Sequence, residues 1–407
     1  MEKERQSCEG GEQKTRVVFV HQSAELYGSD KILLTLVGAL DRTRYDPVVL
    51  LPRVGPLFHR LVEVGVQTHI VPLALVGSTG KLATVLKLPF QLWRANRAMD
   101  RVLGNTRVDF VHANTLAVLS GAVWAWQQGI KHVWHVHEII ERPRYAQNVF
   151  AFVLKTLSWR IVCNSEATRR WMVRTDPKLT TKSLVIRNAV DVKAIDPRRN
   201  QQEGARRERL GLSAEDLLVV LVGRINSRKG HHLLIEAAEL LKDRGWKNVR
   251  YLMVGSPPRS KEHLRDRLLN RIACSAVCDD VRLVDFMTDI KTVWDVCDVA
   301  VIPSTEPESF GLVALEAMAA RRPVVAAGHG GICEVIVDRE TGLLFEPGSK
   351  EALADTLERV FADERYREEL GDRGYQRVLS YFSIREFTCS FEQLYSSRNL
   401  RKDGVGH

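Results

Sequence analysis

Residues 298–319 read DVAVIPSTEPESFGLVALEAMA, and this stretch decides the fold of the second half of the chain. The apolar run up to Pro303 is typical of a short buried strand, and a segment with helical spacing follows Gly311. A polar loop rich in Pro, Ser and Glu joins the two. The first turn of such a helix has free N–H groups and partial positive charge, which predicts a site for phosphate or carboxylate.

The same alternation of strand and helix extends over most of the chain. Short β-branched runs are each followed by a helical segment, which favours a parallel sheet covered on both faces. The runs begin at Arg16, Tyr45, Val108, Lys131, Arg160, Ser183, Leu217, Asn248, Val281, Asp298 and Arg322. We therefore predict an α/β fold with two doubly wound parallel-sheet (Rossmann-like) domains facing a central cleft.

Polar residues 191–211 contain few strand formers, so the domain boundary is predicted there. We expect a disordered tail over residues 1–15, an N-terminal domain over 16–195 and a C-terminal domain over 205–380. Residues 381–407 are expected to form a helix that crosses back to the N-terminal domain, followed by a tail.

The net charge of +9 is unevenly distributed. Residues 1–200 hold 29 Lys and Arg against 17 Asp and Glu, and the remainder holds 30 against 33. A basic half favours an anionic partner, such as a phospholipid surface, a lipid-linked phosphate or nucleic acid. A solvated basic face without a partner stays open as the alternative.

The sequence has no uninterrupted apolar stretch of the roughly eighteen residues that a membrane span requires. Residues 1–15 carry charges of both signs without an apolar core, unlike a secretory signal. Seven cysteines without regular spacing indicate reduced thiols, most of them small buried hydrophobes. These features predict a cytoplasmic protein.

Residues 81–103 (KLATVLKLPFQLWRANRAMDRVL) combine cations at seven-residue spacing with apolar and aromatic residues. The cations are Lys87, Arg94 and Arg101, with Arg97 close by, and the apolar residues include Phe90, Leu92 and Trp93. A basic amphipathic helix of this kind suits an anionic bilayer. The alternative is a core-packed helix with a solvated edge, and Pro89 is expected to interrupt either one.

Residues 221–230 read LVGRINSRKG. A strand is predicted to end at Gly223, with Arg224 and Lys229 in the following loop, at the sheet edge where doubly wound folds bind ligands. Two cations there suit a diphosphate, above all one that gathers charge as a leaving group.

Glu308 and Glu316 flank the helix start, eight positions apart. A hydrolytic acid–base pair needs carboxyl groups about 5 to 9.5 Å apart, whereas eight helical residues rise about 12 Å. The spacing favours two contacts along an elongated ligand, with Glu308 near a sugar and Glu316 near a ribose. The alternative is that Glu308 is a helix-entry residue and that Glu316 lies on a solvated face.

His135 and His137 are predicted to share one face of a strand, with His137 at its carboxyl end. A zinc pair is one alternative, although no third ligand is evident. A structural histidine is the other, above all for His112 and His135.

Together these motifs resemble the nucleotide-binding half of the retaining GT-B glycosyltransferases of family four (glycosyl transferases group 1). The resemblance covers roughly residues 215–360 and rests on the following positions: Gly223-Arg224, Lys229-Gly230, the stretch from Asp298 to Ser304, Glu308 to Leu312, Glu316, Gly330-Gly331, Glu334 and Thr341-Gly342. It assigns donor binding to the C-terminal domain and acceptor binding to the N-terminal domain.

The resemblance also implies roles for single residues. Arg224 and Lys229 would hold the donor diphosphate, Glu308 the donor sugar, and His137 would contact that sugar from the N-terminal domain; these four are the catalytic candidates. The donor-binding candidates are Gly28, Gly223, Ser309, Phe310, Gly311, Leu312 and Glu316. No metal or other cofactor is implied, and the sequence contains no Asp-x-Asp pair.

The resulting hypothesis is retaining, metal-independent transfer of a sugar from a nucleotide diphosphate sugar to an acceptor hydroxyl. Expected partners are the nucleotide-sugar donor, an acceptor glycan or lipid-linked glycan, and an anionic membrane in peripheral contact, but no nucleic acid. The basic first half favours polysaccharide or lipopolysaccharide assembly at the inner face of the membrane.

The first half resembles the family more loosely. Residues 27–30 are Tyr-Gly-Ser-Asp where the family usually has Gly-Gly-Ala-Glu. Two alternatives to the hypothesis stay open: a nucleotide-sugar epimerase of GT-B architecture, and a non-catalytic protein that binds a nucleotide-sugar or nucleic acid. A dehydrogenase is disfavoured, because no G-x-G-x-x-G opens either sheet.

Overall fold

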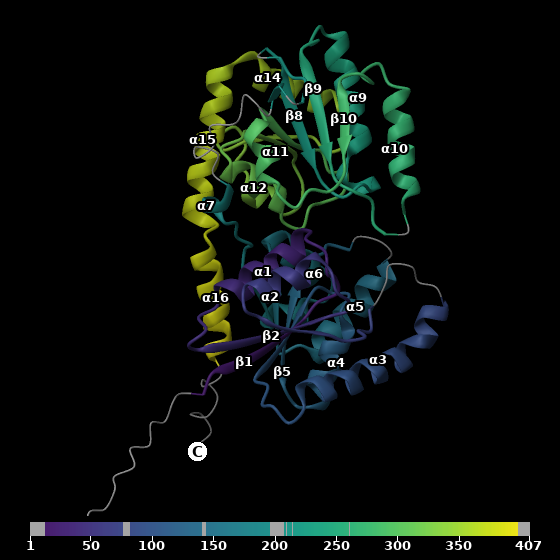
Figure 1. Cartoon of the computed structure of the whole chain (residues 1–407), viewed down its shortest axis with the longest axis vertical. Coiled ribbons are helices and arrows are strands. Elements are labelled where there is room, and N and C mark those ends of the chain that lie inside the picture. The colour runs from purple at the N-terminus through teal and green to yellow at the C-terminus, as the bar shows by residue number, and fades with distance from the viewer. Residues whose placement is uncertain are drawn as a thin grey trace, which may run out of the picture. The chain divides into compact units, whose positions relative to one another are not determined.

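A computed structural model describes residues 13–75, 82–140, 144–195, 207–208, 210–213, 215–259 and 261–397. The chain divides into two compact units (Figure 1). The first contains the described residues up to 136, residues 152–162 and those from 388 onward, and the second contains residues 137–151 and 163–387. Most of the expected terminal tails lies outside the described residues.

A seven-stranded sheet begins the fold, in the order β3-β2-β1-β4-β5-β6-β7. Strands β1 to β5 pair in parallel. The strands are β1 (Thr15–Val20), β2 (Tyr45–Leu51), β3 (Gln67–Ile70), β4 (Phe110–Asn114), β5 (Lys131–Val136), β6 (Arg160–Cys163) and β7 (Ser183–Val185). Val17 to Val20 of β1 are fully buried, as expected of a central strand covered on both faces.

Helices connect these strands. They are α1 (Gly28–Ala39), α2 (Pro56–Glu63), α3 (Leu82–Leu103), α4 (Leu119–Gln127), α5 (Arg144–Leu157) and α6 (Glu166–Thr175), with a 3₁₀ turn η1 (Pro177–Thr181). The short helix α7 (Val192–Ile195) follows the last strand of this sheet. The expectation that Pro89 interrupts the helix over residues 81–103 is wrong, because α3 continues through it. None of the described helices has both the length and the hydrophobicity to span a bilayer.

A six-stranded sheet follows, in the order β10-β9-β8-β11-β12-β13. The strands are β8 (Leu217–Val222), β9 (Val249–Val254), β10 (Val281–Val284), β11 (Val299–Ile302), β12 (Val324–Ala327) and β13 (Leu343–Phe345), and every pair is parallel. Two parallel sheets with intervening helices confirm the predicted doubly wound α/β fold. The strand order reverses between β8 and β11, and ligands of such sheets bind at this switch point.

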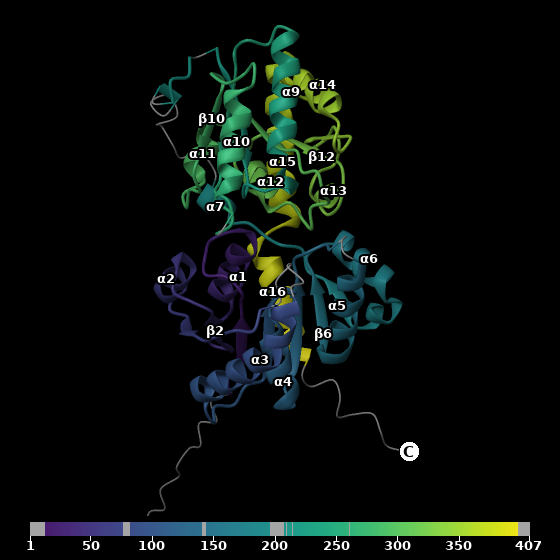
Figure 2. The same ribbon diagram turned by 90° about the vertical axis from the view of Figure 1, so that its right-hand side faces the viewer.

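Alternate residues of β8 enter two separate cores. Leu218 and Val220 belong to one buried cluster, and Val219 and Leu221 belong to another. The helices of this sheet are α9 (His231–Asp243), α10 (His263–Ala273), α11 (Lys291–Val296), α12 (Leu312–Ala319), α13 (Ile332–Val335), α14 (Lys350–Ala362) and α15 (Glu364–Tyr381), with a 3₁₀ turn η3 (Ser227–Lys229). Figure 2 shows α9 and α10 side by side, and both supply residues to the second cluster. The two-residue period therefore buries both faces of β8.

The last helix, α16 (Ile384–Ser396), supplies aromatic residues to the first unit. The Tyr395 ring lies 5.4 Å from that of Phe110 and 6.5 Å from that of Phe19, and its hydroxyl lies 2.7 Å from Nδ1 of His112. Tyr395 is buried, so these contacts tie α16 to β1 and β4.

The expectation that most cysteines are buried is wrong for the described residues. Cys163 and Cys297 are buried, whereas four others are exposed: Cys274, Cys278, Cys333 and Cys389. Burial raises the pKa of the Cys163 thiol to about 12, despite the nearby Arg169 guanidinium. The two buried thiols therefore act as small core side chains, and the exposed ones have no packing role of that kind.

Candidate functional site

The loop after β8 supplies the two predicted cations. Gly223 follows the last residue of β8, and Arg224 lies half-buried next to it. The Asn226 carboxamide oxygen accepts hydrogen bonds from the backbone N–H groups of Arg228 and Lys229, at 3.0 and 3.1 Å, and so shapes the turn η3. This cap directs the chain past Lys229 into α9.

Gly230, which ends that turn, lies directly against the end of β11. Its φ is +71°, and a Cβ atom there would lie 1.8 Å from the carbonyl oxygen of Pro303. Only glycine tolerates both the positive φ and this close contact, because any other residue would be strained and its Cβ atom would clash with the Pro303 backbone. A second tie joins the same two loops: the Thr305 N–H donates to the carbonyl of Arg228 at 2.8 Å.

The loop after β11 carries the predicted glutamate. Glu308 forms a parallel bridge with Gly330, and its carbonyl accepts from the Gly331 N–H at 2.6 Å. Gly311, with φ of +103°, ends the loop and begins α12. The backbone on both sides of the Glu308 side chain is therefore held in place.

Lys229 and Glu308 meet between these two loops. Lys229 Nζ lies 2.6 Å from Glu308 Oε1, and the Ser304 hydroxyl donates to the same oxygen at 2.5 Å. The Lys229 and Glu308 side chains are 29% and 16% exposed, so the pair is shielded yet reachable from solvent. The structure thus brings together a predicted diphosphate-binding cation and a predicted sugar-binding carboxylate, 79 positions apart in sequence.

The electrostatics of this pair favour the ionised carboxylate. Burial alone would raise the pKa of Glu308, but the Lys229 ammonium and the hydrogen bonds from Lys229 and Ser304 outweigh it and lower that pKa below its ordinary value. Glu308 is therefore an anion that accepts hydrogen bonds, not an acid that supplies a proton at neutral pH.

Glu316 lies on α12 and is only 4% exposed. The alternative that it occupies a solvated helix face is therefore wrong. The other predicted donor-binding residues occupy the start of the same helix: Ser309 is half-buried in the loop, Phe310 is buried, and Leu312 is the first helical residue. All of these residues belong to the second unit.

Gly28 belongs to the first unit, where it begins α1. The loop before it is fixed by Asp30, whose carboxylate accepts from the Tyr27 N–H at 3.0 Å and lies 2.5 Å from Nε2 of His21. Asn114, at the end of β4, donates to the Ser29 carbonyl at 3.1 Å. Tyr27, standing where the family usually has glycine, is accommodated as the N-cap of α1.

His137 does not lie on a strand as predicted, because β5 ends at Val136. It is half-buried, and its backbone N–H donates to the Glu138 carboxylate at 3.1 Å. His112 and His135 are fully buried, with their rings 5.5 Å apart, which agrees with structural roles for both. Within the described part of the chain, no group of three or more His, Cys, Asp or Glu side chains could hold a metal ion.

Three residues of this region carry contacts that the sequence did not predict. Ser304 holds Glu308, as described above. Ser165, the N-cap of α6, donates to the Ser309 carbonyl at 2.6 Å, and Glu334, on α13, accepts hydrogen bonds from the first turn of α6. Ser304 and Glu334 both had a sequence signal, because they belong to the motifs that carry the family resemblance, whereas Ser165 had none.

Two family models match the chain, one in each half. The model described as Glycosyltransferase Family 4 matches residues 28–194, and the model described as Glycosyl transferases group 1 matches residues 202–377. The first match ends and the second begins within the predicted domain boundary, residues 191–211, and the second match includes both Lys229 and Glu308. The predicted resemblance is thereby confirmed.

Two curated relatives show the extent of similarity. The D-inositol 3-phosphate glycosyltransferase of Corynebacterium glutamicum is 30% identical over 234 residues, 55% of this chain and 54% of that protein. The capsular polysaccharide biosynthesis glycosyltransferase CapM of Staphylococcus aureus is 30% identical over 190 residues, 47% of this chain and 48% of that protein. The chain spans about half the length of the curated relatives that it matches.

Among solved structures, HepE of Anabaena in complex with UDP and glucose has a TM-score of 0.82 at 22% identity. The match covers 94% of this chain and 100% of HepE, which shows a shared fold. On the strength of both family models and this fold, the chain belongs to the family 4 glycosyltransferases with the GT-B fold.

Proposed function

We propose that this protein transfers a sugar, with retention, from a nucleoside diphosphate sugar to an acceptor hydroxyl. The observation that carries the proposal is the Lys229–Glu308 pair at the switch point of the second sheet, with Ser304 on the same carboxylate oxygen. A cation and an ionised carboxylate at this edge match the two chemically different parts of such a donor, its phosphates and its sugar hydroxyls.

In this proposal Arg224 and Lys229 bind the donor diphosphate and stabilise the charge that develops on the leaving nucleoside diphosphate. Two fixed cations supply the charge that a divalent metal provides in other enzymes, so the transfer is proposed to be metal-independent. Gly223 lets the donor approach the backbone at the end of β8 closely, because glycine has no side chain. Gly28 has the same role at the start of α1.

Glu308 accepts hydrogen bonds from the sugar hydroxyls, while the backbone at the start of α12 faces the donor with free N–H groups. Glu316 binds the ribose hydroxyls, and His137 contacts the sugar. The acceptor attacks from the side that the leaving group vacates, and a donor phosphate oxygen takes the acceptor proton. Positioning and charge stabilisation are then the main contributions of the protein.

The proposed acceptor is a glycan or lipid-linked glycan of a cell-surface polysaccharide or lipopolysaccharide. Support comes from the basic residues 1–200 and from CapM, whose name describes capsular polysaccharide biosynthesis. Peripheral contact with an anionic membrane is part of this proposal, and α3 is the surface that suits it.

On α3, Leu86, Phe90 and Trp93 are 72%, 63% and 57% exposed. The rings of Phe90 and Trp93 stack with their centroids 5.9 Å apart, and the Arg97 guanidinium lies 5.8 Å from the Trp93 ring centroid. The cations Lys87 and Arg94 are exposed on the same helix. Exposed aromatic side chains among cations suit the headgroup region of an anionic bilayer.

A panel of sugar nucleotides tests the donor part of the proposal. UDP-glucose, UDP-N-acetylglucosamine, GDP-mannose and ADP-glucose are added singly, and the melting temperature is measured, because a ligand that binds only the folded state raises it. At least one is expected to stabilise the protein and to be consumed only when an acceptor is present. Consumption without any acceptor would instead indicate an epimerase or a hydrolase, and no stabilisation by any of them would contradict the proposal.

A further inference from the structure

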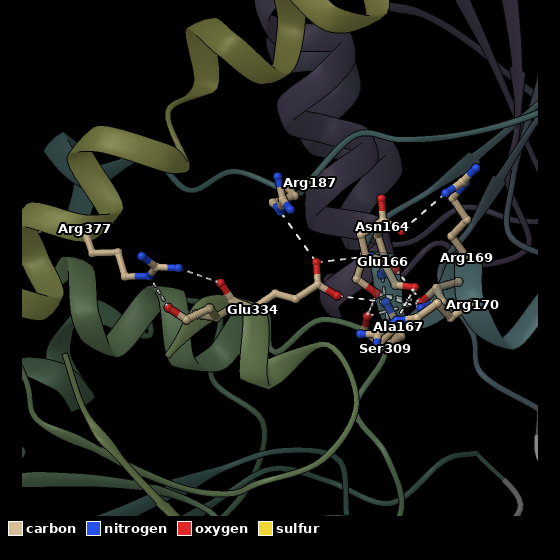
Figure 3. Close-up of polar contacts among 12 residues, drawn as sticks. Asn164, Glu166, Ala167, Arg169, Arg170, Arg187, Ser309, Glu334 and Arg377 are labelled. Atoms are coloured by element: carbon tan, nitrogen blue, oxygen red, sulfur yellow. Dashed lines mark hydrogen bonds and ion pairs between the residues drawn. The ribbon is translucent and has the colours of Figure 1, made fainter. Parts of the chain in front are cut away.

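The loop that carries Glu308 is also held by the start of α6 (Figure 3). The Ser165 hydroxyl donates to the Ser309 carbonyl at 2.6 Å, and the Asn164 carboxamide N–H group donates to the Ser309 hydroxyl at 3.4 Å. Thr168 is also within 3.3 Å of that carbonyl. Asn164, Ser165 and Thr168 are at most 1% exposed, so these contacts form in a dry environment, where hydrogen bonds are strongest.

Glu334 makes a second contact with the same helix start. Its carboxylate accepts from the backbone N–H of Glu166 at 3.0 Å and from that of Ala167 at 2.8 Å, the first two residues of α6. The Arg187 guanidinium lies 3.6 Å from the same carboxylate. A carboxylate at this position satisfies free N–H groups and complements the positive end of the helix dipole.

The short helix that carries Glu334 is fixed from its other end. Arg377, on α15, donates to the carbonyls of Val335 and Glu334 at 2.7 and 2.9 Å (Figure 3). Gly331, which precedes that helix, donates to the Glu308 carbonyl. A Cβ atom on Gly331 would lie 2.2 Å from the Ser309 carbonyl oxygen, so the two loops pack backbone against backbone.

We propose that Ser165 and Glu334 are positioning residues that hold Ser309, and with it Glu308, in the geometry needed for sugar transfer. This inference rests on the proposed function. Neither side chain belongs to the loop of Arg224 and Lys229. Their loss should therefore affect the catalytic step more than the binding of a nucleoside diphosphate.

A purely structural role would be capping of α6, because Ser165 Oγ also accepts from the Thr168 N–H at 2.9 Å. Ser349 is a matched control: it caps α14 by accepting from the Ala352 N–H at 3.0 Å. Ser349→Ala removes a cap of the same kind without touching the loop of Glu308. Both serine variants are expected to lower the melting temperature, Ser165→Ala more than Ser349→Ala because it also removes the buried hydrogen bond to the Ser309 carbonyl.

The experiment uses the full chain and three variants, Ser165→Ala, Glu334→Gln and Ser349→Ala. Glutamine keeps the size of Glu334 but removes its charge and one of its two accepting oxygens, so this variant tests the proposal even if Ser165→Ala folds poorly. The probes are UDP-glucose, UDP-N-acetylglucosamine, GDP-mannose and ADP-glucose, each with an acceptor that supports its consumption by wild type, and UDP, GDP and ADP for the binding of the diphosphate alone. Turnover, KM and the Kd for each diphosphate are measured.

We expect kcat to fall about tenfold or more in Ser165→Ala and in Glu334→Gln, while the Kd for the diphosphate changes less than about twofold. Ser349→Ala should keep wild-type kcat. If wild type turns over a sugar nucleotide and Ser165→Ala and Glu334→Gln both keep its kcat, the positioning role is refuted and the proposed function stands. If wild type neither binds nor consumes any of the four sugar nucleotides, the proposed function fails and the positioning role fails with it.

Discussion

Lys229 Nζ and Glu308 Oε1 lie 2.6 Å apart, at the carboxyl ends of two neighbouring strands. The contact joins the turn after β8 to the loop after β11, and Gly230 allows these two backbones to touch. Lys229 therefore binds a side chain that, in the proposed reaction, holds the sugar. The phosphates and the sugar of a donor would then be recognised by two side chains that are hydrogen-bonded to each other.

The lowered pKa of Glu308 predicts how the contribution of the Lys229–Glu308 pair to stability changes in acid. At pH values above the ordinary pKa of about 4.5, the ionised Glu308 carboxylate makes its full contribution to stability. That contribution is lost as the pH falls through the lower pKa that Glu308 has in the folded chain. The difference in unfolding free energy between wild type and Glu308→Gln, measured with urea, should be constant near neutral pH and shrink below about pH 4.5. A difference that grows on acidification would contradict the assignment.

Lys229→Ala should reverse the sign of this effect. Without the ammonium, we expect burial to outweigh the hydrogen bond from Ser304 and the charge of Arg228, and so to raise the pKa of Glu308. As the pH rises from about 4 to about 7, the unfolding free energy of Lys229→Ala should then fall relative to that of the double variant Lys229→Ala/Glu308→Gln. A flat difference over that range would show that Lys229 does not control the carboxylate.

Gly230→Ala should damage the site more than a substitution at another glycine whose φ is positive but whose surroundings are open. Gly245 also has a positive φ, +100°, but a Cβ atom there meets nothing within 4 Å. Gly245→Ala is therefore expected to lower the unfolding free energy by about 1–2 kcal/mol and to leave turnover unchanged. Gly230→Ala should cost more stability and lower turnover, because Pro303 must move. Equal effects of the two variants on melting temperature and turnover would contradict this account.

The exposed aromatic residues of α3 should support vesicle binding. Phe90→Ser/Trp93→Ser is expected to reduce cosedimentation with phosphatidylglycerol vesicles at low salt by severalfold, and added salt should weaken the binding of wild type. Tyr381→Ser is the control, since Tyr381 on α15 is 62% exposed and also has a guanidinium over its ring, 5.2 Å from the centroid. If wild type does not sediment with these vesicles at low salt, the membrane contact is wrong.

The sequence predicted the central strands well, because their β-branched runs are buried on both faces. Two edge strands, β3 and β13, were missed. β3 reads Gln-Thr-His-Ile and has two exposed residues, and β13 has only three residues, so neither shows the buried run on which the prediction depends. Proline at position 89 was overinterpreted, since α3 continues through it.

The candidate site was predicted as residue types at strand ends, and the parallel topology then brought Lys229 and Glu308 together. The hydroxyl of Ser304 on that carboxylate and the burial of Glu316 depend on side-chain packing, which spacing alone does not encode. The contacts of Ser165 with Ser309 join residues 144 positions apart. No local pattern marks such a pair, because each residue has an ordinary role in its own segment.

The most direct test of the central claim compares Lys229→Ala with Arg228→Ala. Arg228 is the adjacent cation in the same turn, with its side chain 59% exposed and paired to Glu306 at 3.7 Å. Turnover is measured with the sugar nucleotide that stabilises wild type best, and circular dichroism checks the fold. We predict a loss of about a hundredfold to a thousandfold in Lys229→Ala and near-normal turnover in Arg228→Ala. Near-normal turnover in a folded Lys229→Ala protein would contradict the account.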